Sequence, residues 1–287
     1  MHIQVPASTA NLGPGFDSIG MAVSLYLKVE ILGKSKNWQI DHHLGNLPHD
    51  EHNLIVQSAL KACLDLEPLR LKVSSDIPIA HGLGSSSSAI VAGIELADQM
   101  AGLGMTNEEK VELASQIEGH PDNVAPTILG GLIAGSFINQ HFDVVELPLL
   151  PYDFVAYIPE YNLTTKKARS VLPTKLDYAT ATHASAIANT LVASLAMKKY
   201  EQVGELMQAD MFHEPYRENL VPELKKIRQI AQKEKALATY LSGAGPTVMT
   251  VIKAERSSAF IKHLQLSGLD GRLVHLKPDL HGAQVIK

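Results

Sequence analysis

Residues 78–89, PIAHGLGSSSSA, connect a predicted strand to a predicted amphipathic helix. Gly82 and Gly84 let the backbone adopt a positive φ and approach a ligand closely. The unpaired N–H groups and the dipole at the start of the helix favour an anion such as phosphate. No lysine follows the glycines, as it would in a Walker A loop, and Ser87 stands where a dinucleotide fingerprint has its third glycine. The stretch therefore predicts a phosphate-binding loop that carries no cation of its own, with an ordinary serine-capped helix start as the alternative.

The residues around this loop predict a mixture of strands and helices. Four apolar residues are spaced by four, three and four positions and so lie on one face of a helix: Ile90, Ile94, Ala97 and Ala101. Thr106 and Glu109 have the form of a capping box, which predicts a second helix running toward Glu118. The other elements expected in this half are a helix at 53–64 and strands at 3–6, 23–32, 69–74, 132–138, 144–147 and 154–158.

The pattern changes after a break at residues 159–163, which predicts a domain boundary. Two alanine-rich helices are expected beyond it, at 178–197 and 200–211, followed by a helix at 222–234, strands at 237–241 and 247–252, a helix at 257–266 and a strand at 272–276. This order is typical of an antiparallel sheet backed by helices. A chain of 287 residues can form two compact units, and we expect domains at 1–158 and 159–287.

Composition narrows the cellular setting and the kinds of partner. Hydrophobic residues make up 45% of the chain and charged residues 19%, as in ordinary globular proteins. The net charge of −5 offers no broad basic field, so neither nucleic acid nor a membrane is an expected partner. The first residues do not resemble a secretory signal, and the single Cys63 excludes an internal disulfide framework. We therefore expect a cytoplasmic protein.

Two further loops combine flexible backbone with polar groups. Residues 6–17, PASTANLGPGFD, carry Asn11 and Asp17, whose amide and carboxylate can hold an ammonium or a hydroxyl group. Residues 242–247, SGAGPT, lie between two predicted strands and can bring bare backbone at Gly243 next to a ligand. Taken alone, each of these loops is more typical of a simple turn.

Together, the three loops resemble the GHMP kinase superfamily in their order and spacing. Within it the chain is similar to the homoserine kinases, because of EGHPDNVAP at 118–126, TTKKAR with Arg169 and EPYR with Arg217. The likeness extends over nearly the whole chain. It implies a two-domain α+β fold, with a mixed α/β nucleotide-binding domain followed by a ferredoxin-like antiparallel sheet backed by helices. The implied reaction is ATP-dependent phosphorylation of the side-chain hydroxyl of L-homoserine to O-phospho-L-homoserine and ADP, in threonine biosynthesis.

The resemblance also implies roles for individual residues. It puts ATP on the serine-rich loop, at Pro78, Ile79, Ala80, His81, Gly82, Leu83, Gly84, Ser85, Ser86, Ser87 and Ser88. It implies that Ser86 and Glu118 bind Mg²⁺, as suits an oxygen-preferring cation. The amino-acid substrate is expected at Asn11, Asp17, His120, Thr165, Arg169, Arg217 and Gly243. Of these, Asp17 suits the ammonium group, and Arg169 and Arg217 suit the carboxylate.

The catalytic residues implied are Asn123, Glu118 and Arg169. Some relatives, such as mevalonate kinase, are thought to use an aspartate near the position of Asn123, and an amide cannot serve as a base at neutral pH. We therefore expect catalysis by positioning and charge neutralisation, with the proton passing to the phosphate during transfer. Many relatives have one or two serines after GLG, whereas this chain has four, at 85–88, so the choice of Ser86 as metal ligand stays open among them.

Other functions remain as alternatives. The chain has no G-x-S-x-G elbow around its serines, which argues against a serine hydrolase. A kinase for another small alcohol, such as mevalonate or shikimate, and a non-catalytic ligand sensor of the same fold stay open, and a homodimer is the assembly that we consider. One histidine-rich segment matches no zinc pattern and is interpreted as a solvated loop; it contains His42, His43, His49, Asp50, Glu51 and His52.

Overall fold

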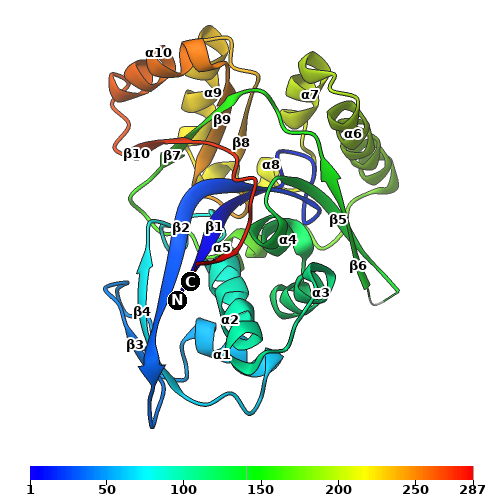
Figure 1. Ribbon diagram of the computed structural model, residues 1–287. Coiled ribbons are helices and arrows are strands. Elements are labelled where there is room, and N and C mark those ends of the chain that lie inside the picture. The colour runs from blue at the N-terminus through cyan, green and yellow to red at the C-terminus, as the bar shows by residue number, and fades with distance from the viewer. Residues whose placement is uncertain (140, 287) are drawn as a thin grey trace.

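Two β-sheets organise the chain, as the computed structural model shows for residues 1–139 and 141–286 (Figure 1). The first sheet has the strand order β11-β1-β2-β4-β3, and β5 and β6 extend it from β2. Its strands are β1 (His2–Ala10), β2 (Ile19–Lys34), β3 (Gln39–Asp41), β4 (Leu69–Ser75), β5 (Leu132–Ile138), β6 (His141–Leu147) and β11 (Gln284–Ile286). Neighbouring strands are antiparallel except for β3 and β4.

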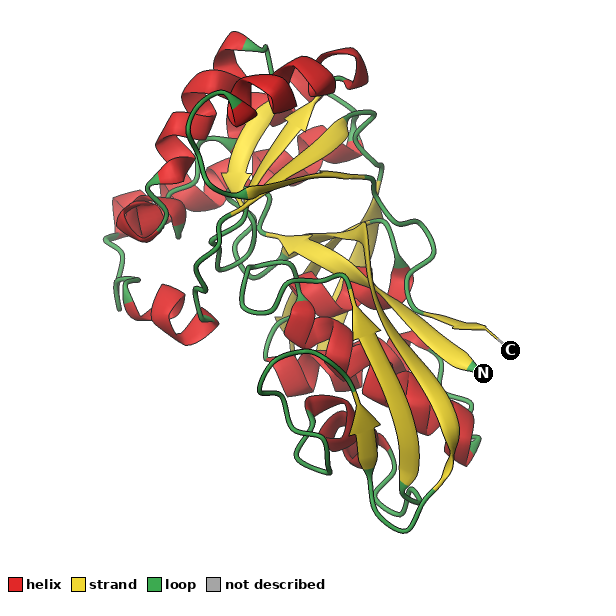
Figure 2. Ribbon diagram, turned by 90° about the vertical axis from the view of Figure 1, so that its left-hand side faces the viewer, coloured by secondary structure: helices red, strands yellow, loops and turns green. Residues whose placement is uncertain are grey.

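Four helices accompany the first sheet: α1 (Leu54–Ala62), α2 (Ser85–Ala101), α3 (Asn107–Glu118) and α4 (Pro121–Leu129) (Figure 2). Helices α2 and α4 pack directly on β1 and β2. The predicted helix is confirmed, with Ile90, Ile94 and Ala97 of α2 buried as expected. Its expected amphipathic character is wrong, because all residues from Ile90 to Asp98 are buried and Ala101 is exposed. The predicted capping box is confirmed too, since both reciprocal hydrogen bonds between Thr106 and Glu109 are present at the start of α3.

The second sheet is antiparallel throughout, as the sequence predicted, and its strand order is β10-β7-β9-β8. Its strands are β7 (Asp153–Ile158), β8 (Ala238–Leu241), β9 (Val248–Ile252) and β10 (Arg272–Leu276). Helices α9 (Glu223–Lys233) and α10 (Ala254–Gln265) pack on it. The alanine-rich pair α6 (Tyr178–Ala196) and α7 (Tyr200–Met207) lies to one side, with α7 in contact with β8 (Figure 1). None of the helices in the described part of the chain is long and apolar enough to cross a membrane.

The two sheets exchange strands across the expected domain boundary. β7 ends at Ile158, yet it pairs with β9 and β10 of the second sheet. β11, close to the C-terminus, pairs with β1, so the two chain ends lie side by side (Figure 2). The division into residues 1–158 and 159–287 stays a prediction, and the sheets themselves divide the chain between β6 and β7 and again after β10.

Three short helices carry residues of the site, and the sequence did not predict them as helices. They are α4, α5 (Thr165–Ser170) and α8 (Glu214–Arg217), the last followed by the 3₁₀ turn η1 (Glu218–Leu220). α4 starts at Pro121 and contains Pro126, and α8 has a proline in its first turn. Proline is tolerated in the first helical turn but reads as a break within a longer pattern. Helices of four to nine residues with prolines therefore leave almost no periodic signal.

Candidate active site

Residues from all three predicted loops line one cavity. Every residue expected to contact the amino-acid substrate is among them, together with Asn123 and Glu118. The lining residues are Asn11, Phe16, Asp17, Ala80, Gly82, Gly84, Ser85, Ser86, Ser87, Glu118, His120, Asp122, Asn123, Leu163, Thr165, Arg169, Arg217, Gly243 and Ala244. The chain thus brings together groups that are more than two hundred residues apart in sequence.

The loop at 78–88 is shaped by close backbone packing. Gly82 and Gly84 both have positive φ, at 72° and 68°. A Cβ on Gly82 would lie 2.2 Å from the carbonyl oxygen of Ser242, and one on Gly84 would lie 2.2 Å from Ser8 Oγ. Gly84 caps α2 without any side-chain hydrogen bond, so the first N–H groups of α2 can bind a ligand. Both glycines are therefore required by space as well as by conformation.

Not every residue of this loop faces the cavity. Leu83 is buried in the core, and Ser88 is buried with its hydroxyl donating to the carbonyl oxygens of Pro6 and Gly84. The two ring nitrogens of His81 lie 2.7 Å from the carbonyl oxygen of Ile79 and 3.0 Å from that of Pro159. These residues hold the loop in place, and the residues of the loop that line the cavity are Ala80, Gly82, Gly84, Ser85, Ser86 and Ser87.

A buried chain of hydroxyl groups joins the three loops. Ser242 Oγ donates to the carbonyl oxygen of Gly82 at 2.7 Å. Ser242 must then accept from Thr9 Oγ1 at 2.8 Å, and Thr9 must accept from the hydroxyl of Tyr240 at 3.1 Å. Because the carbonyl oxygen of Gly82 can only accept, it fixes the direction of all three hydrogen bonds. These bonds hold Thr9, Gly82 and Ser242 in one arrangement. Thr9 lies in β1, which extends to Ala10, four residues beyond the end expected from the sequence.

Ser86 and Ser87 differ in their surroundings although both line the cavity. Ser87 is buried, and its hydroxyl donates to Glu118 Oε1 at 3.1 Å. Ser86 is exposed, and no hydrogen bond engages its hydroxyl among the described residues. Burial raises the pKa of Glu118, and the charge of His120 and the hydrogen bond from Ser87 oppose that effect in part. Ser86 and Glu118 thus offer free oxygen ligands, while Ser87 orients the carboxylate.

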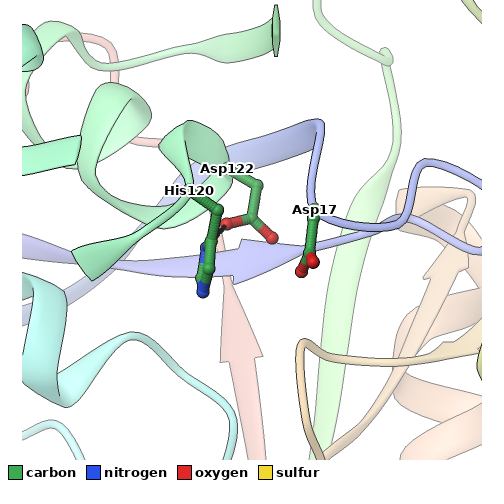
Figure 3. Close-up of side chains that lie close together, drawn as sticks. All are labelled: Asp17, His120 and Asp122. Carbon is green, nitrogen blue, oxygen red and sulfur yellow. Dashed lines mark hydrogen bonds and ion pairs between the residues drawn. The ribbon is translucent and has the colours of Figure 1, made fainter. Parts of the chain in front are cut away.

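His120, Asp122 and Asp17 lie close together at the start of α4 (Figure 3). His120 Nδ1 is hydrogen-bonded to Asp122 Oδ1, which also accepts from Asn123 Nδ2 at 3.2 Å. Burial lowers the pKa of His120, but the hydrogen bond and charge of Asp122 outweigh it, so this pKa is raised. Asn123 Oδ1 accepts from Ser8 Oγ at 2.9 Å. Both ends of the Asn123 amide are therefore held.

Asp17 and Arg169, expected to bind opposite ends of the substrate, are paired with each other. Arg169 donates to both carboxylate oxygens, NH1 to Oδ2 at 3.0 Å and NH2 to Oδ1 at 2.7 Å. Both side chains remain partly exposed to the cavity. The backbone N–H of Asp17 donates to Asn11 Oδ1 at 3.2 Å, which ties the carboxylate to the loop at 6–17. A negative and a positive group thus stand side by side in the cavity.

Arg217 is buried, with only 2% of its surface exposed. Its Nε donates to the carbonyl oxygen of Ala168 at 3.2 Å and its NH1 to that of Gly243 at 3.0 Å. Burial, assisted by the charge of Arg169, lowers the pKa of Arg217 to about 10, so the side chain stays cationic at neutral pH. The guanidinium carbons of Arg169 and Arg217 lie 5.5 and 5.4 Å from the ring centre of Phe16.

A second, mostly apolar cavity of about 310 Å³ adjoins the loop at Ser85 and Ser86. Its walls come from β2, the segment at 42–53 with the start of α1, β4 with the residues after it, and the start of α2. They are Leu27, His42, Leu44, Leu47, Pro48, His52, Asn53, Leu54, Ile55, Val73, Ser75, Ile77, Ile79 and Ala89. The sequence did not reveal it, because apolar residues from four separate segments build it. His43, His49 and His52 are exposed, as a solvated loop requires, whereas His42 is buried and stacks on His49 with ring centres 4.0 Å apart.

Comparisons of this sequence with known proteins all indicate the same family. Residues 53–131 match the GHMP kinases N terminal domain, and residues 191–265 match the GHMP kinases C terminal family. A homoserine kinase of Lactobacillus acidophilus is 61% identical over 287 residues, 100% of both chains. One of Limosilactobacillus fermentum is 59% identical over 285 residues, 99% of this chain and 100% of its own.

Solved structures give the same result. A putative homoserine kinase from Listeria monocytogenes superposes with a TM-score of 0.90 at 41% identity, covering 100% of this chain and 99% of its own. A mevalonate kinase of L. major, solved in complex with R-mevalonate, has a TM-score of 0.74 at 17% identity over 95% of this chain and 94% of its own, and shares the fold. With its sequence, two sheets and three loops all in agreement, the chain belongs to the homoserine kinase family of the GHMP kinases.

Proposed function

We propose that this protein transfers the γ-phosphoryl group of ATP to the side-chain hydroxyl of L-homoserine, giving O-phospho-L-homoserine and ADP in threonine biosynthesis. The observation that carries the proposal is the single cavity. It combines an anion-binding helix start, a free pair of oxygen ligands and an Asp–Arg pair with a second, buried arginine. Phosphate, a hard metal ion and a zwitterionic amino acid each have a matching group there.

ATP would extend over both cavities. The triphosphate suits the loop at 78–88, where backbone N–H groups at the start of α2 do most of the binding. The base suits the apolar cavity of about 310 Å³, which is wide enough for a purine and meets the phosphate loop at Ser85 and Ser86. Ser85 and Ser86 line both cavities, which supports this path for a nucleotide.

The residues present fit a magnesium ion. Ser86 offers an exposed hydroxyl and Glu118 a carboxylate already oriented by Ser87, and Mg²⁺ prefers oxygen ligands of this kind. When bound, the metal would neutralise charge on the phosphates, a task for which the loop carries no lysine. The protein's own part is to hold these two oxygens beside the phosphate-binding N–H groups.

Homoserine would lie between the charged groups on the opposite side of the cavity. Asp17 suits the ammonium group, with Asn11, His120, Thr165 and Gly243 around it. Arg169 and Arg217 suit the carboxylate, because a planar guanidinium group can donate two parallel hydrogen bonds to it. This arrangement favours a substrate that carries both charges over a small alcohol that lacks an ammonium group.

Catalysis would rest on positioning rather than on a protein base. The Asn123 amide cannot take a proton, and its two ends are held by Ser8 and Asp122. Oδ1 of Asp122 is itself engaged by His120 and Asn123. Arg169 and Glu118 lie on the same cavity, where they can balance the charge that develops on the transferred group. The hydroxyl proton would pass to the phosphate during a loose transfer.

The test is a panel of acceptors with ATP and Mg²⁺, following ADP release. We expect a kcat/KM for L-homoserine at least a hundredfold above those for mevalonate and shikimate, on the order expected for losing a charged contact. Preference for either other alcohol would assign a different substrate within the same fold. Binding of ATP and homoserine without ADP release would instead favour a ligand sensor.

A further inference from the structure

The five N–H groups of Arg217 are divided between the protein and the cavity. Three of them are held: Nε donates to Ala168, and NH1 donates both to the Gly243 carbonyl oxygen and to His213 Nδ1, the last at 3.1 Å. NH2 has no hydrogen-bond partner within the described residues, and Arg217 lines the cavity. The direction in which NH2 points is therefore set by the partners of Nε and NH1.

The protonation of His213 follows from its two partners. His213 is completely buried, and its Nε2 lies 2.9 Å from the carbonyl oxygen of Gly13. A carbonyl oxygen only accepts, so Nε2 carries the hydrogen. Nδ1 is then left with a lone pair, which accepts from Arg217 NH1. Burial also lowers the pKa of His213, despite the opposing charges of Asp210 and Glu214, so the ring stays neutral at pH 7.

The ring of His213 is fixed on its other sides as well. Asp210 Oδ2 accepts from the backbone N–H groups of His213 and Glu214, at 2.9 and 2.7 Å, and lies 3.5 Å from Nε2. The ring of Phe16 stacks on His213, with centres 5.3 Å apart and planes inclined by 23°. Phe16 in turn lies under the guanidinium groups of Arg169 and Arg217. His213 thus connects the loop at 6–17 to the buried arginine.

We propose that His213 is a positioning residue for substrate recognition, whose Nδ1 lone pair turns Arg217 so that NH2 faces the carboxylate of the amino-acid substrate. The inference rests on the proposed function, because it assigns Arg217 to that carboxylate. His213 itself lines neither the site nor the cavity. It acts only through the arginine, and it discriminates substrates by the presence of a carboxylate.

Two substitutions of His213 each keep one hydrogen bond of its ring and remove the other. In His213→Asn, the amide oxygen takes the place of Nδ1 and keeps an acceptor for Arg217, while the contact with Gly13 is lost. In His213→Gln, the longer amide puts an N–H group at the place of Nε2 and keeps the contact with Gly13, while the acceptor for Arg217 is lost. Each variant is measured with homoserine and with 3-aminopropan-1-ol, which is homoserine without its carboxylate.

We expect His213→Gln to lower kcat/KM for homoserine about tenfold, mainly through KM, as for loss of one hydrogen bond to a charged group. The kcat/KM for 3-aminopropan-1-ol and the KM for ATP should change less than about twofold, and His213→Asn should keep homoserine activity within about threefold of the wild type. Equal losses for both variants, or equal losses for both substrates in His213→Gln, would overturn the proposal and leave His213 a structural residue.

Activity of the wild-type protein on homoserine tests the proposed function separately from this inference. If it does not phosphorylate homoserine, calorimetric binding of homoserine to the wild type and to His213→Gln replaces the kinetics. Weaker binding by the variant supports the positioning role, and equal or absent binding overturns it. If the variants fail to fold, ¹⁵N NMR spectra of the histidine side chains in the wild-type protein show which ring nitrogen of His213 carries the proton. A neutral His213 with its proton on Nε2 is expected, and a proton on Nδ1 contradicts the inference.

Discussion

Neighbouring serines in the phosphate loop should respond differently to loss of their hydroxyl groups. Ser86→Ala removes an exposed oxygen that we assign to Mg²⁺, so we expect the Mg²⁺ concentration for half-maximal rate to rise about tenfold or more. Ser87→Ala leaves that ligand in place and only frees Glu118, so the rise should be about threefold. Rates measured across a Mg²⁺ titration decide, and the reverse order would assign the metal to Ser87.

Asn123→Ala tests whether the site contains a base. The change releases Ser8 and removes one partner of Asp122, so we expect kcat to fall about tenfold through poorer positioning. The pH profile of kcat should keep its shape, because an amide has no proton to exchange. Asn189→Ala on the exposed surface of α6 serves as control and should leave kcat unchanged. A steep new dependence on pH in Asn123→Ala would contradict the absence of a base.

Single residues of the site were predictable only where a motif surrounds them. Arg169 and Arg217, which line the cavity, were expected there through family motifs, because an isolated arginine has no local pattern that separates a ligand-binding role from a surface role. Phe16 and His213 were missed, although Phe16 lies inside the quoted loop. Their roles depend on stacking between segments about two hundred residues apart, which no local pattern encodes.

At the scale of elements, a buried charge cluster fastens α3 to α2. Lys110 Nζ lies 2.9 Å from both oxygens of Glu95 and 2.8 Å from Asp98 Oδ2, and all three side chains are at most 9% exposed. Lys110→Met would leave two buried carboxylates unpaired, and we expect a loss of about 3–5 kcal/mol in the free energy of unfolding. Urea unfolding measures it, with the exposed Lys61→Met as control. Equal values for the two variants would contradict this account.

The same cluster gives a pH dependence. Burial lowers the pKa of Lys110, but the hydrogen bonds that its ammonium group donates to Asp98 and Glu95 outweigh this effect, so the pKa is raised in the folded protein. Stability from this lysine is therefore fully present below its unfolded pKa and lost as the pH rises through the higher folded pKa. The gap in unfolding free energy between the wild type and Lys110→Met should thus be smaller at about pH 11 than at about pH 8. A gap that widens would contradict the sign.

The hydroxyl chain between the loops predicts an order of effects. Thr9→Val leaves the buried Tyr240 hydroxyl without an acceptor and takes a donor from Ser242, at a cost of about 2 kcal/mol. Tyr240→Phe removes only the first donor and should cost about 1 kcal/mol. Denaturant unfolding gives both values, and Tyr178→Phe on the exposed surface is the control. A larger loss of unfolding free energy in Tyr240→Phe than in Thr9→Val would contradict the direction assigned to these hydrogen bonds.

The sequence predicted the helices that have a strong local pattern, and it missed the short helices of the site. The helix from Ser85 follows from apolar periodicity, and the next one from its capping box at Thr106. α4, α5 and α8 were missed because four to nine residues cover too few turns for a period to emerge. Tertiary contacts hold these short helices, as the bonds of Arg217 in α8 illustrate. The site is therefore built largely on elements that local propensity does not specify.

The whole molecule should unfold as one unit. One hydrophobic cluster contains Trp38 and Ile3 beside the first sheet together with Phe154, Met249 and Val251 of the second. Unfolding followed by fluorescence of Trp38, the single tryptophan, should coincide with unfolding followed by circular dichroism. ATP with homoserine should shift both transitions together, since both would bind only the folded chain. Two separate midpoints would show that the sheets unfold independently.

Which strands pair across the molecule was beyond the sequence patterns. The strand content of the second half was recognised, yet β7 pairs with strands about a hundred residues later, and β11 returns to β1. Local alternation identifies a strand but not its partner, because pairing depends on the packing of the complete chain. The expected boundary after residue 158 followed a change in composition, whereas the strand exchange follows from the topology.

The most direct measurement of the central claim follows the hydroxyl oxygen of homoserine into the product. L-homoserine labelled with ¹⁸O in its side-chain hydroxyl is incubated with the protein, ATP and Mg²⁺, and the mixture is observed by ³¹P NMR. We predict one phosphomonoester whose resonance carries the isotope shift of a P–¹⁸O bond, formed in step with ADP. ADP accompanied only by inorganic phosphate, or a phosphomonoester without the isotope shift, would contradict the account.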